Sequence, residues 1–262
     1  PQRGDNLQLI DMANKNAMQI FNEKEKKEAS WRSLSGAMLK KLNLQRSPEI
    51  IECLDISNIG GKQAVGSLVN FKKGEPDKSS FRHYKIRTVE GPDDYSMMKE
   101  VIRRRIKRAI DEDTLPDLFV VDGGRGQLSM ALAIADEFSI TDKLDWLGIA
   151  KEKKEEGEKI YKPGRKNPIL LLPHNPVLLY LMRIRDESHR YGVTFHRKLR
   201  NKATLLSELD AVPGIGKEKK QNLLRHLGSL KQIKMASIEE LQEVKGIGEG
   251  LAKQINNHFH PI

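Results

Sequence analysis

The first forty residues of the chain carry apolar side chains at helical spacing. These side chains are Leu9, Ile10, Met12, Ala13, Ala17, Ile20 and Phe21, with charged residues between them. Apolar residues that recur every three or four positions share one face of a helix, so the pattern predicts a helix from residue 6 to about 42. Ser47-Pro48 ends it, because a residue before proline avoids the helical conformation. We expect residues 1–47 to form a helical arm that packs on the next domain or leads in from preceding sequence.

From Glu49 the period changes to one that is typical of strands. The segments EIIECLDIS (49–57), QAVGSLVNFKKG (63–74) and FRHYKIRTV (81–89) each read as a strand, and Gly- and Lys-rich turns separate them. Short turns join antiparallel neighbours, so these segments predict an antiparallel meander.

Helical and strand patterns then alternate. The predicted elements are a helix from Gly91-Pro92-Asp93-Asp94 to Ile110, a strand that ends at Asp122, a helix over about 126–138, a strand over 145–151, a charged hairpin over 152–172 and a long helix from Pro176. Antiparallel strands followed by alternating helices and strands predict an α/β domain with a mixed sheet and helices on its faces. We place this domain at residues 48–203, and its order of elements resembles that of ribonuclease H-like domains.

The last sixty residues contain a near-repeat. VPGIGKEKKQNLLRHLGSL begins at Val212 and VKGIGEGLAKQINNHF begins at Val244, so each copy has an apolar residue, a Gly-Ile-Gly turn and an amphipathic helix. A single such turn would usually be an ordinary loop, but two matching copies favour a smaller all-α tandem helix-hairpin-helix domain over 204–262.

Such turns suit contact with a DNA backbone. Glycine allows a tight turn, and the turn presents backbone N–H groups at a helix start, where a phosphate is well received. We expect phosphate contacts with little base readout. The turn residues are Gly214, Ile215, Gly216 and Lys217 in the first copy and Gly246, Ile247 and Gly248 in the second. We expect the two isoleucines to anchor the turns in the core.

Composition narrows the class of protein. The chain has 262 residues, 38% of them hydrophobic, a mean hydropathy of -0.57 and no long uncharged apolar run, which argues against a membrane span. The N-terminus lacks a signal-peptide pattern, and it begins with Pro1 rather than Met, which indicates part of a longer protein. One cysteine, Cys53, suits a reducing cytoplasm.

The net charge of +10 points to an anionic partner. Two basic runs, Lys99–Arg108 and Arg183–Lys202, lie before the near-neutral last sixty residues. Either run alone could be a solvated helix face, but two in one domain favour a polyanion-binding surface. The candidate phosphate contacts are Arg103, Arg104, Arg105, Arg190 and Arg197.

Several carboxylates occur where strands end or helices begin. Asp55 shares the parity of Ile51, Cys53 and Ser57, so it lies on a largely apolar strand face, where an unpaired carboxylate would be costly. Asp122 ends another strand before Gly123-Gly124. Converging carboxylates would hold Mg²⁺ or Mn²⁺, the ions that enable phosphodiester hydrolysis.

Each of these residues also has a structural interpretation. Asp93, Asp94 and Asp122 could cap the helices that follow them, and His189 could be an ordinary exposed histidine. The stretch GGRGQLS could suggest a phosphate loop, but it lacks the spacing of either nucleotide-binding motif.

The motifs ECLDIS, GPDDYSMMKEVIRRR, PDLFVVDGGRGQL, LGIAK and RIRDESHRYGVTFHRKLR, in this order and followed by tandem Gly-Ile-Gly turns, resemble the C-terminal half of the UvrC family. The resemblance covers residue 49 to the end, and RGDNLQLIDMANKNA also resembles the segment before this domain. It implies a ribonuclease H-like endonuclease that cuts 5′ of a lesion in damaged double-stranded DNA during bacterial nucleotide excision repair. It also implies UvrB as a partner, after loading by UvrA.

The resemblance assigns the catalytic and metal-binding roles to Asp55, Asp94, Asp122 and His189, with Mg²⁺ or Mn²⁺ as the cofactor. Two departures from the family pattern occur. Asn58 stands where the family often has histidine, and Pro92 adjoins Asp93-Asp94. Two other functions are compatible with the sequence: a non-catalytic DNA-binding adaptor on a degenerate ribonuclease H-like scaffold, and a resolvase or ribonuclease H-type enzyme that acts alone.

Overall fold

The computed structural model describes residues 5–57, 64–89, 91, 93–151, 157–210 and 212–260. Asn58 and Pro92 therefore lie outside the described residues. The chain forms two compact units, Pro1–Val193 and Thr194–Ile262. Among the described helices, none is long and apolar enough to cross a membrane.

The first unit contains one mixed sheet and the helices that cover it. Its elements are α1 (Asp5–Leu42), β1 (Ile50–Ser57), β2 (Val65–Lys72), β3 (Glu75–Pro76), the 3-10 helix η1 (Lys78–Ser80), β4 (Arg82–Lys85), α2 (Asp94–Asp111), β5 (Leu118–Asp122), α3 (Arg125–Glu137), β6 (Asp145–Lys151), β7 (Glu158–Tyr161) and the first part of α4 (Pro176–Asp210).

The sheet has seven strands in the order β3-β2-β1-β5-β6-β7, and β4 also pairs with β2. β1 and β2 are antiparallel, as are β2 and β4, which confirms the meander. β1, β5 and β6 are parallel to one another, and β7 returns antiparallel to β6, so the predicted mixed sheet is also confirmed. Lys73 and Gly74 join β2 to β3 with φ values of 50° and 86°, the positive values that a two-residue hairpin turn requires.

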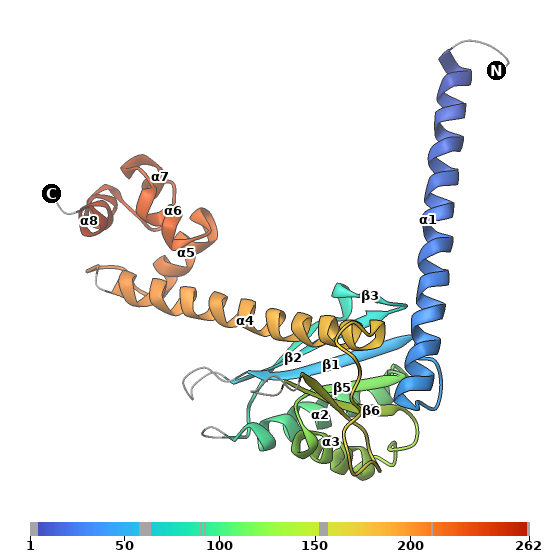
Figure 1. Cartoon of the computed structure of the whole chain (residues 1–262). Helices are drawn as coiled ribbons and strands as arrows, with labels where there is room; N and C mark the ends of the chain where they lie inside the picture. Colours follow the sequence, from blue (N-terminus) through green and yellow to red (C-terminus); the bar gives the residue numbers. More distant parts are fainter. Residues whose placement is uncertain are drawn as a thin grey trace. The chain divides into compact units, whose positions relative to one another are not determined.

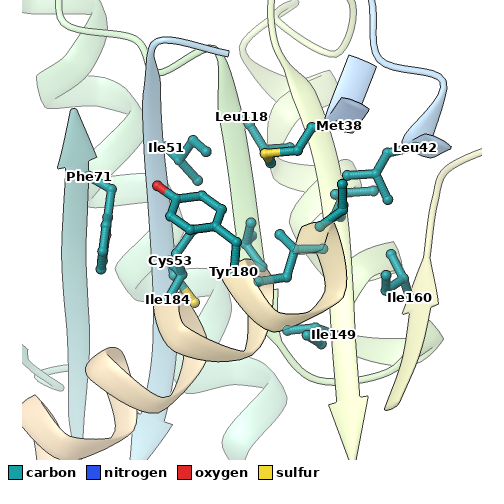
Figure 2. Packing of buried hydrophobic residues seen from close by; sticks show 14 of the residues in the cluster. Met38, Leu42, Ile51, Cys53, Phe71, Leu118, Ile149, Ile160, Tyr180 and Ile184 are labelled. Carbon is teal, nitrogen blue, oxygen red and sulfur yellow. The ribbon is translucent and has the colours of Figure 1, made fainter. Parts of the chain in front are cut away.

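Strand residues alternate between two buried layers. Leu54, Phe119 and Val121 pack against α2 and α3, whereas Ile51, Cys53, Leu118 and Val120 pack against α1 and α4. Figure 1 shows α2 and α3 on one face of the sheet and the first part of α4 on the other. Figure 2 shows Tyr180 and Ile184 of α4 near Ile51 and Cys53 of β1, and Met38 and Leu42 of α1 in the same cluster.

The second unit is helical. After the end of α4 it contains α5 (Lys217–Leu227), α6 (Leu230–Met235), α7 (Ile238–Gln242) and α8 (Glu249–Phe259). Ile215 and Ile247 are 7% and 4% exposed and belong to its core cluster, together with Val212 and Val244. The expected anchoring of both Gly-Ile-Gly turns by their isoleucines is therefore confirmed.

Candidate active site

Strand pairing places two carboxylates side by side. In the parallel pair of β1 and β5, Cys53 lies opposite Val120 and Leu54 opposite Val121. The next position in that register brings Asp55 level with Asp122. Both aspartates have the parity of Cys53 and Val120, so they lie on the sheet face that α1 and α4 cover.

A histidine from α4 completes the cluster. His189 Nδ1 lies 3.5 Å from Asp55 Oδ2. One ligand atom from each of Asp55, Asp122 and His189 lies within 4.8 Å of the other two. Asp55 is 6% exposed, whereas the His189 side chain is 64% exposed. The cluster is therefore buried on its sheet side and open to solvent on its histidine side.

The electrostatics of this cluster favour a bound cation. Burial and the neighbouring charge of Asp55 raise the pKa of Asp122 to about 6, while the Arg185 guanidinium acts in the opposite direction. Arg185 is itself buried and forms ion pairs with Glu158 and Asp186. Two carboxylates that repel each other in a poorly solvated place are stabilised when a cation is bound between them.

Two serines and a glycine surround Asp55. Ser57 Oγ donates to Asp55 Oδ2 at 3.2 Å, and Ser67 lies opposite Asp55 in the β1–β2 register. A Cβ atom on Gly192 would lie 2.6 Å from Ser57 Oγ and 2.9 Å from Ser67 Oγ, so the missing side chain lets α4 approach the sheet here. Of these three residues, only Ser57 is indicated by the sequence, through its parity with Asp55 along the strand. Ser67 and Gly192 become apparent only from the strand register and the packing of α4.

The two aspartates at the start of α2 are not part of the cluster found among the described residues. Asp93 is the N-cap of α2, and its side chain accepts from Ser96 N at 3.1 Å. Asp94 is the exposed first residue of that helix and is not in the cluster found among the described residues. α2 packs on the sheet face opposite to the one that Asp55 and Asp122 share. A catalytic role for Asp94 stays a prediction.

Asp122 does not serve as the cap of α3. The N-cap position is Gly124, whose N–H donates to Gln127 Oε1 at 2.8 Å. A Cβ atom on Gly123 would lie 2.2 Å from the Gln127 side chain, so the loop after β5 has no room for a larger residue unless Gln127 moves. The Asp122 carboxylate thus belongs to the cluster with Asp55 rather than to the helix start.

The basic run on α2 is largely engaged within the protein. Arg103 pairs with Glu137 at 2.7 Å, and Arg104 donates to Glu100 at 3.0 Å. Arg105 is 7% exposed and pairs with buried Glu52 at 2.8 Å. The expectation of a phosphate contact by Arg105 is therefore wrong, because its guanidinium is buried.

The other two candidate arginines lie on α4. Arg190 pairs with Glu187 at 2.6 Å, with 63% of the Arg190 side chain exposed, and Arg197 is exposed. A phosphate contact by Arg103, Arg104, Arg190 or Arg197 stays a prediction.

Both helix-hairpin-helix turns have equivalent backbone geometry. Gly214 and Gly246 have φ values of 84° and 89°, in the region that favours glycine. Gly216 and Gly248 are the N-caps of α5 and α8, and a Cβ atom on either would meet no atom within 4 Å. Lys217 begins α5 and is exposed. The first-turn N–H groups of α5 and α8 thus suit an approaching anion. A DNA contact by these turns stays a prediction.

Comparisons with known proteins agree with both units. The profile described as UvrC RNAse H endonuclease domain matches residues 39–193, and that described as SAM-like helix-hairpin-helix tandem matches residues 206–258. UvrABC system protein C of Desulfotalea psychrophila is 68% identical over 255 residues, which cover 97% of this chain and 42% of that protein. The Citrifermentans bemidjiense protein of the same name is 44% identical over 270 residues, with 99% and 43% covered.

The chain thus spans about two fifths of the length of these curated relatives. Among solved structures, the Bacillus subtilis Endonuclease_V is 12% identical with a TM-score of 0.33 over 63% of this chain and 91% of that one. The family match covers more than half of the chain and coincides with the sheet domain that holds Asp55, Asp122 and His189. This chain belongs to the UvrC family, through its RNase H endonuclease domain.

Proposed function

We propose that this chain is the part of a bacterial excision nuclease that makes the 5′ incision next to a lesion in damaged double-stranded DNA. The observation that carries the proposal is the cluster of Asp55, Asp122 and His189 in a UvrC-type endonuclease domain. The tandem helix-hairpin-helix unit supports DNA binding by the same chain.

The donor set fits a divalent cation. Two carboxylates and an imidazole offer hard oxygen ligands and one nitrogen, a combination that suits Mg²⁺ or Mn²⁺. When bound, the cation would neutralise charge on the scissile phosphate and lower the pKa of a water molecule. The raised pKa of Asp122 fits the same site, because a cation would favour its ionised form.

Each of the three side chains would have a role in metal binding or proton transfer that follows from its position. Asp55 is held by Ser57 on the buried side and would fix the cation relative to the sheet. Asp122 would bind it from the neighbouring strand. His189 lies on the solvent side and would either complete the ligand set or carry a proton during hydrolysis. In-line attack by water would leave a 5′-phosphate and a 3′-hydroxyl.

The relatives are named as proteins C of a UvrABC system, which supports a joint activity with partners. We propose that the chain acts in the bacterial cytoplasm on DNA that UvrA and UvrB have loaded. Efficient incision should therefore require these partners. Efficient cleavage of RNA–DNA hybrids by this chain alone would instead favour a ribonuclease H-type enzyme.

Asp122→Asn tests the proposed chemistry. We expect metal-dependent nicking to fall on the order of 10²–10³-fold, because the variant loses a charged ligand but keeps its volume. DNA affinity without divalent metal should stay unchanged. Asp142→Asn, at an exposed position outside the cluster, is the matched control and should cut normally.

Nicking by Asp122→Asn at the wild-type rate would place the metal site elsewhere. A wild-type chain that binds DNA but does not cut with partners, damaged DNA and Mn²⁺ all present would indicate the non-catalytic adaptor.

A further inference from the structure

A basic groove lies near the start of β1, whereas the candidate active site lies near the end of the same strand. It has a volume of about 520 Å³ and is formed by α1, the β2–β3 turn and α4. Six cationic side chains line it: Lys24, Lys27, Arg32, Lys72, Lys73 and Arg183. Its acidic lining residues are Glu28, Glu49 and Glu75. The groove therefore has an excess of three positive charges.

Most of this charge is available to a ligand. Lys73 lies 3.7 Å from Glu49, and Arg183 lies 3.4 Å from Glu75, in two exposed pairs that solvent weakens. The other four cations make no ion pair with any carboxylate in the described part of the chain. All four are exposed: Lys24, Lys27, Arg32 and Lys72.

Rigid packing holds the groove open. The rings of Trp31 and Tyr180 lie 5.5 Å apart and are both largely buried. The hairpin turn packs directly on Trp31, because a Cβ atom on Gly74 would lie only 2.7 Å from its ring. The cations therefore project from elements that are fixed against one another, which lowers the entropic cost of binding.

Trp31 and Tyr180 in the wall of the groove pack on the sheet face that also carries the metal cluster, whereas Lys72 has the parity of Leu68 and reaches the groove from the other face at the end of β2. Lys72 lies opposite Ile50, five residues before Asp55 along β1, which corresponds to about 17 Å. That is about five base pairs of B-DNA. The arginines of α2 lie over the opposite face and are already paired, so they are less well placed to contact a duplex at the cluster.

We propose that this groove binds the phosphate backbone of the DNA about five base pairs from the scissile phosphate. The inference rests on the proposed endonuclease function and adds to it a contact surface outside the helix-hairpin-helix unit. A duplex backbone fits the observations because it supplies regularly spaced anions to cations that come from separate elements. Backbone contacts of this kind fix the position of the DNA without reading its sequence.

The double variant Lys27→Gln/Lys72→Gln tests the groove, measured in EDTA so that no cutting occurs. Both side chains are exposed, so we expect the fold to persist. Affinity for a damaged duplex should fall about tenfold, and the slope of log K against log salt should become shallower by about 2, because two phosphate contacts are lost. Lys99→Gln/Lys107→Gln on α2 removes the same charge and should change both quantities much less.

Replacing single phosphates by neutral methylphosphonates locates the contact. The wild-type chain should lose affinity when the substitution lies about five base pairs from the cut, whereas the groove variant should be insensitive there. An unchanged affinity and salt slope in the groove variant would overturn the proposal. The proposal would also be overturned if the groove variant bound DNA normally but no longer bound an acidic peptide that the wild-type chain binds. That result would make the groove a protein-docking surface. Metal-dependent incision that Asp122→Asn abolishes would still support the proposed function in either case.

Discussion

Asp122 shows how a single residue can be unfavourable for folding and useful for function. Its carboxylate is partly buried beside that of Asp55, and burial together with the neighbouring charge raises its pKa to about 6. A carboxylate with a raised pKa is poorly stabilised in its ionised form, and this is the form that binds a cation. The repulsion between the two aspartates is thus a cost that the metal would remove.

This cost should appear in the pH dependence of stability. The folded state binds more protons than the unfolded state between the ordinary aspartate pKa of 3.8 and the raised value of about 6, so Asp122 lowers the free energy of unfolding as pH rises through that window. Asp122→Asn should remove the effect and stabilise the metal-free protein at pH 7 by up to about 3 kcal/mol. Urea unfolding in EDTA at pH 4 to 7 measures it. If the free energies of unfolding of the wild type and the variant differed by the same amount at every pH, the raised pKa would not belong to Asp122.

The sequence indicated those site residues that interrupt an apolar strand pattern. It did not indicate the roles of residues whose surroundings depend on tertiary contacts. Asp55 and Asp122 were identifiable because each interrupts an apolar strand. Arg105 was misplaced because sequence spacing does not show which helix arginine meets a buried acid, and it likewise does not show which sheet face the helix of Asp94 covers. The structure answers both, with α2 on the opposite face and Glu52 under Arg105.

At the scale of elements, α2 is attached to the sheet by a buried ion pair. Arg105 donates to both carboxylate oxygens of Glu52 on β1 and to the Thr114 carbonyl, and Asn70 also donates to Glu52. The basic run on α2 thus contains one structural arginine among exposed ones. Charge in the sequence shows the run, but only packing separates these roles.

Arg105→Gln should destabilise the chain by about 3–5 kcal/mol, because Glu52 would remain as a buried and unpaired charge. Arg103→Gln removes a half-exposed pair with Glu137 and should cost less than about 1 kcal/mol. Denaturant unfolding of the two variants provides a matched comparison. Equal effects would show that the Glu52–Arg105 pair does not anchor α2.

At the scale of the whole molecule, much of the architecture was predictable. The strand over 145–151 and the helix start at Pro176 were placed correctly, the second because proline is favoured in the first turn of a helix. The two Gly-Ile-Gly turns indicated the second unit by repetition. The order of strands could not be derived from local pattern, because β1 and β5 pair across more than fifty residues of intervening chain.

The helix-hairpin-helix unit should contribute DNA affinity without affecting the metal cluster. Gly216→Ala/Gly248→Ala adds two methyl groups in open space at helix starts, so it should cost less than about 1 kcal/mol of stability. Affinity for duplex DNA should nevertheless fall about tenfold, because the methyl groups would obstruct an approaching phosphate. Gly36→Ala on α1, also in open space, is the control. Unchanged affinity, measured by fluorescence anisotropy, would count against the turns as DNA contacts.

The most direct test of the account is anomalous scattering from Mn²⁺ in crystals of this chain. We expect a peak at about 2–2.5 Å from carboxylate oxygens of both Asp55 and Asp122, on the side where His189 lies. The same crystals of Asp122→Asn should show the peak weakened or lost. A strong peak elsewhere, with none between the two carboxylates, would contradict the proposed incision site.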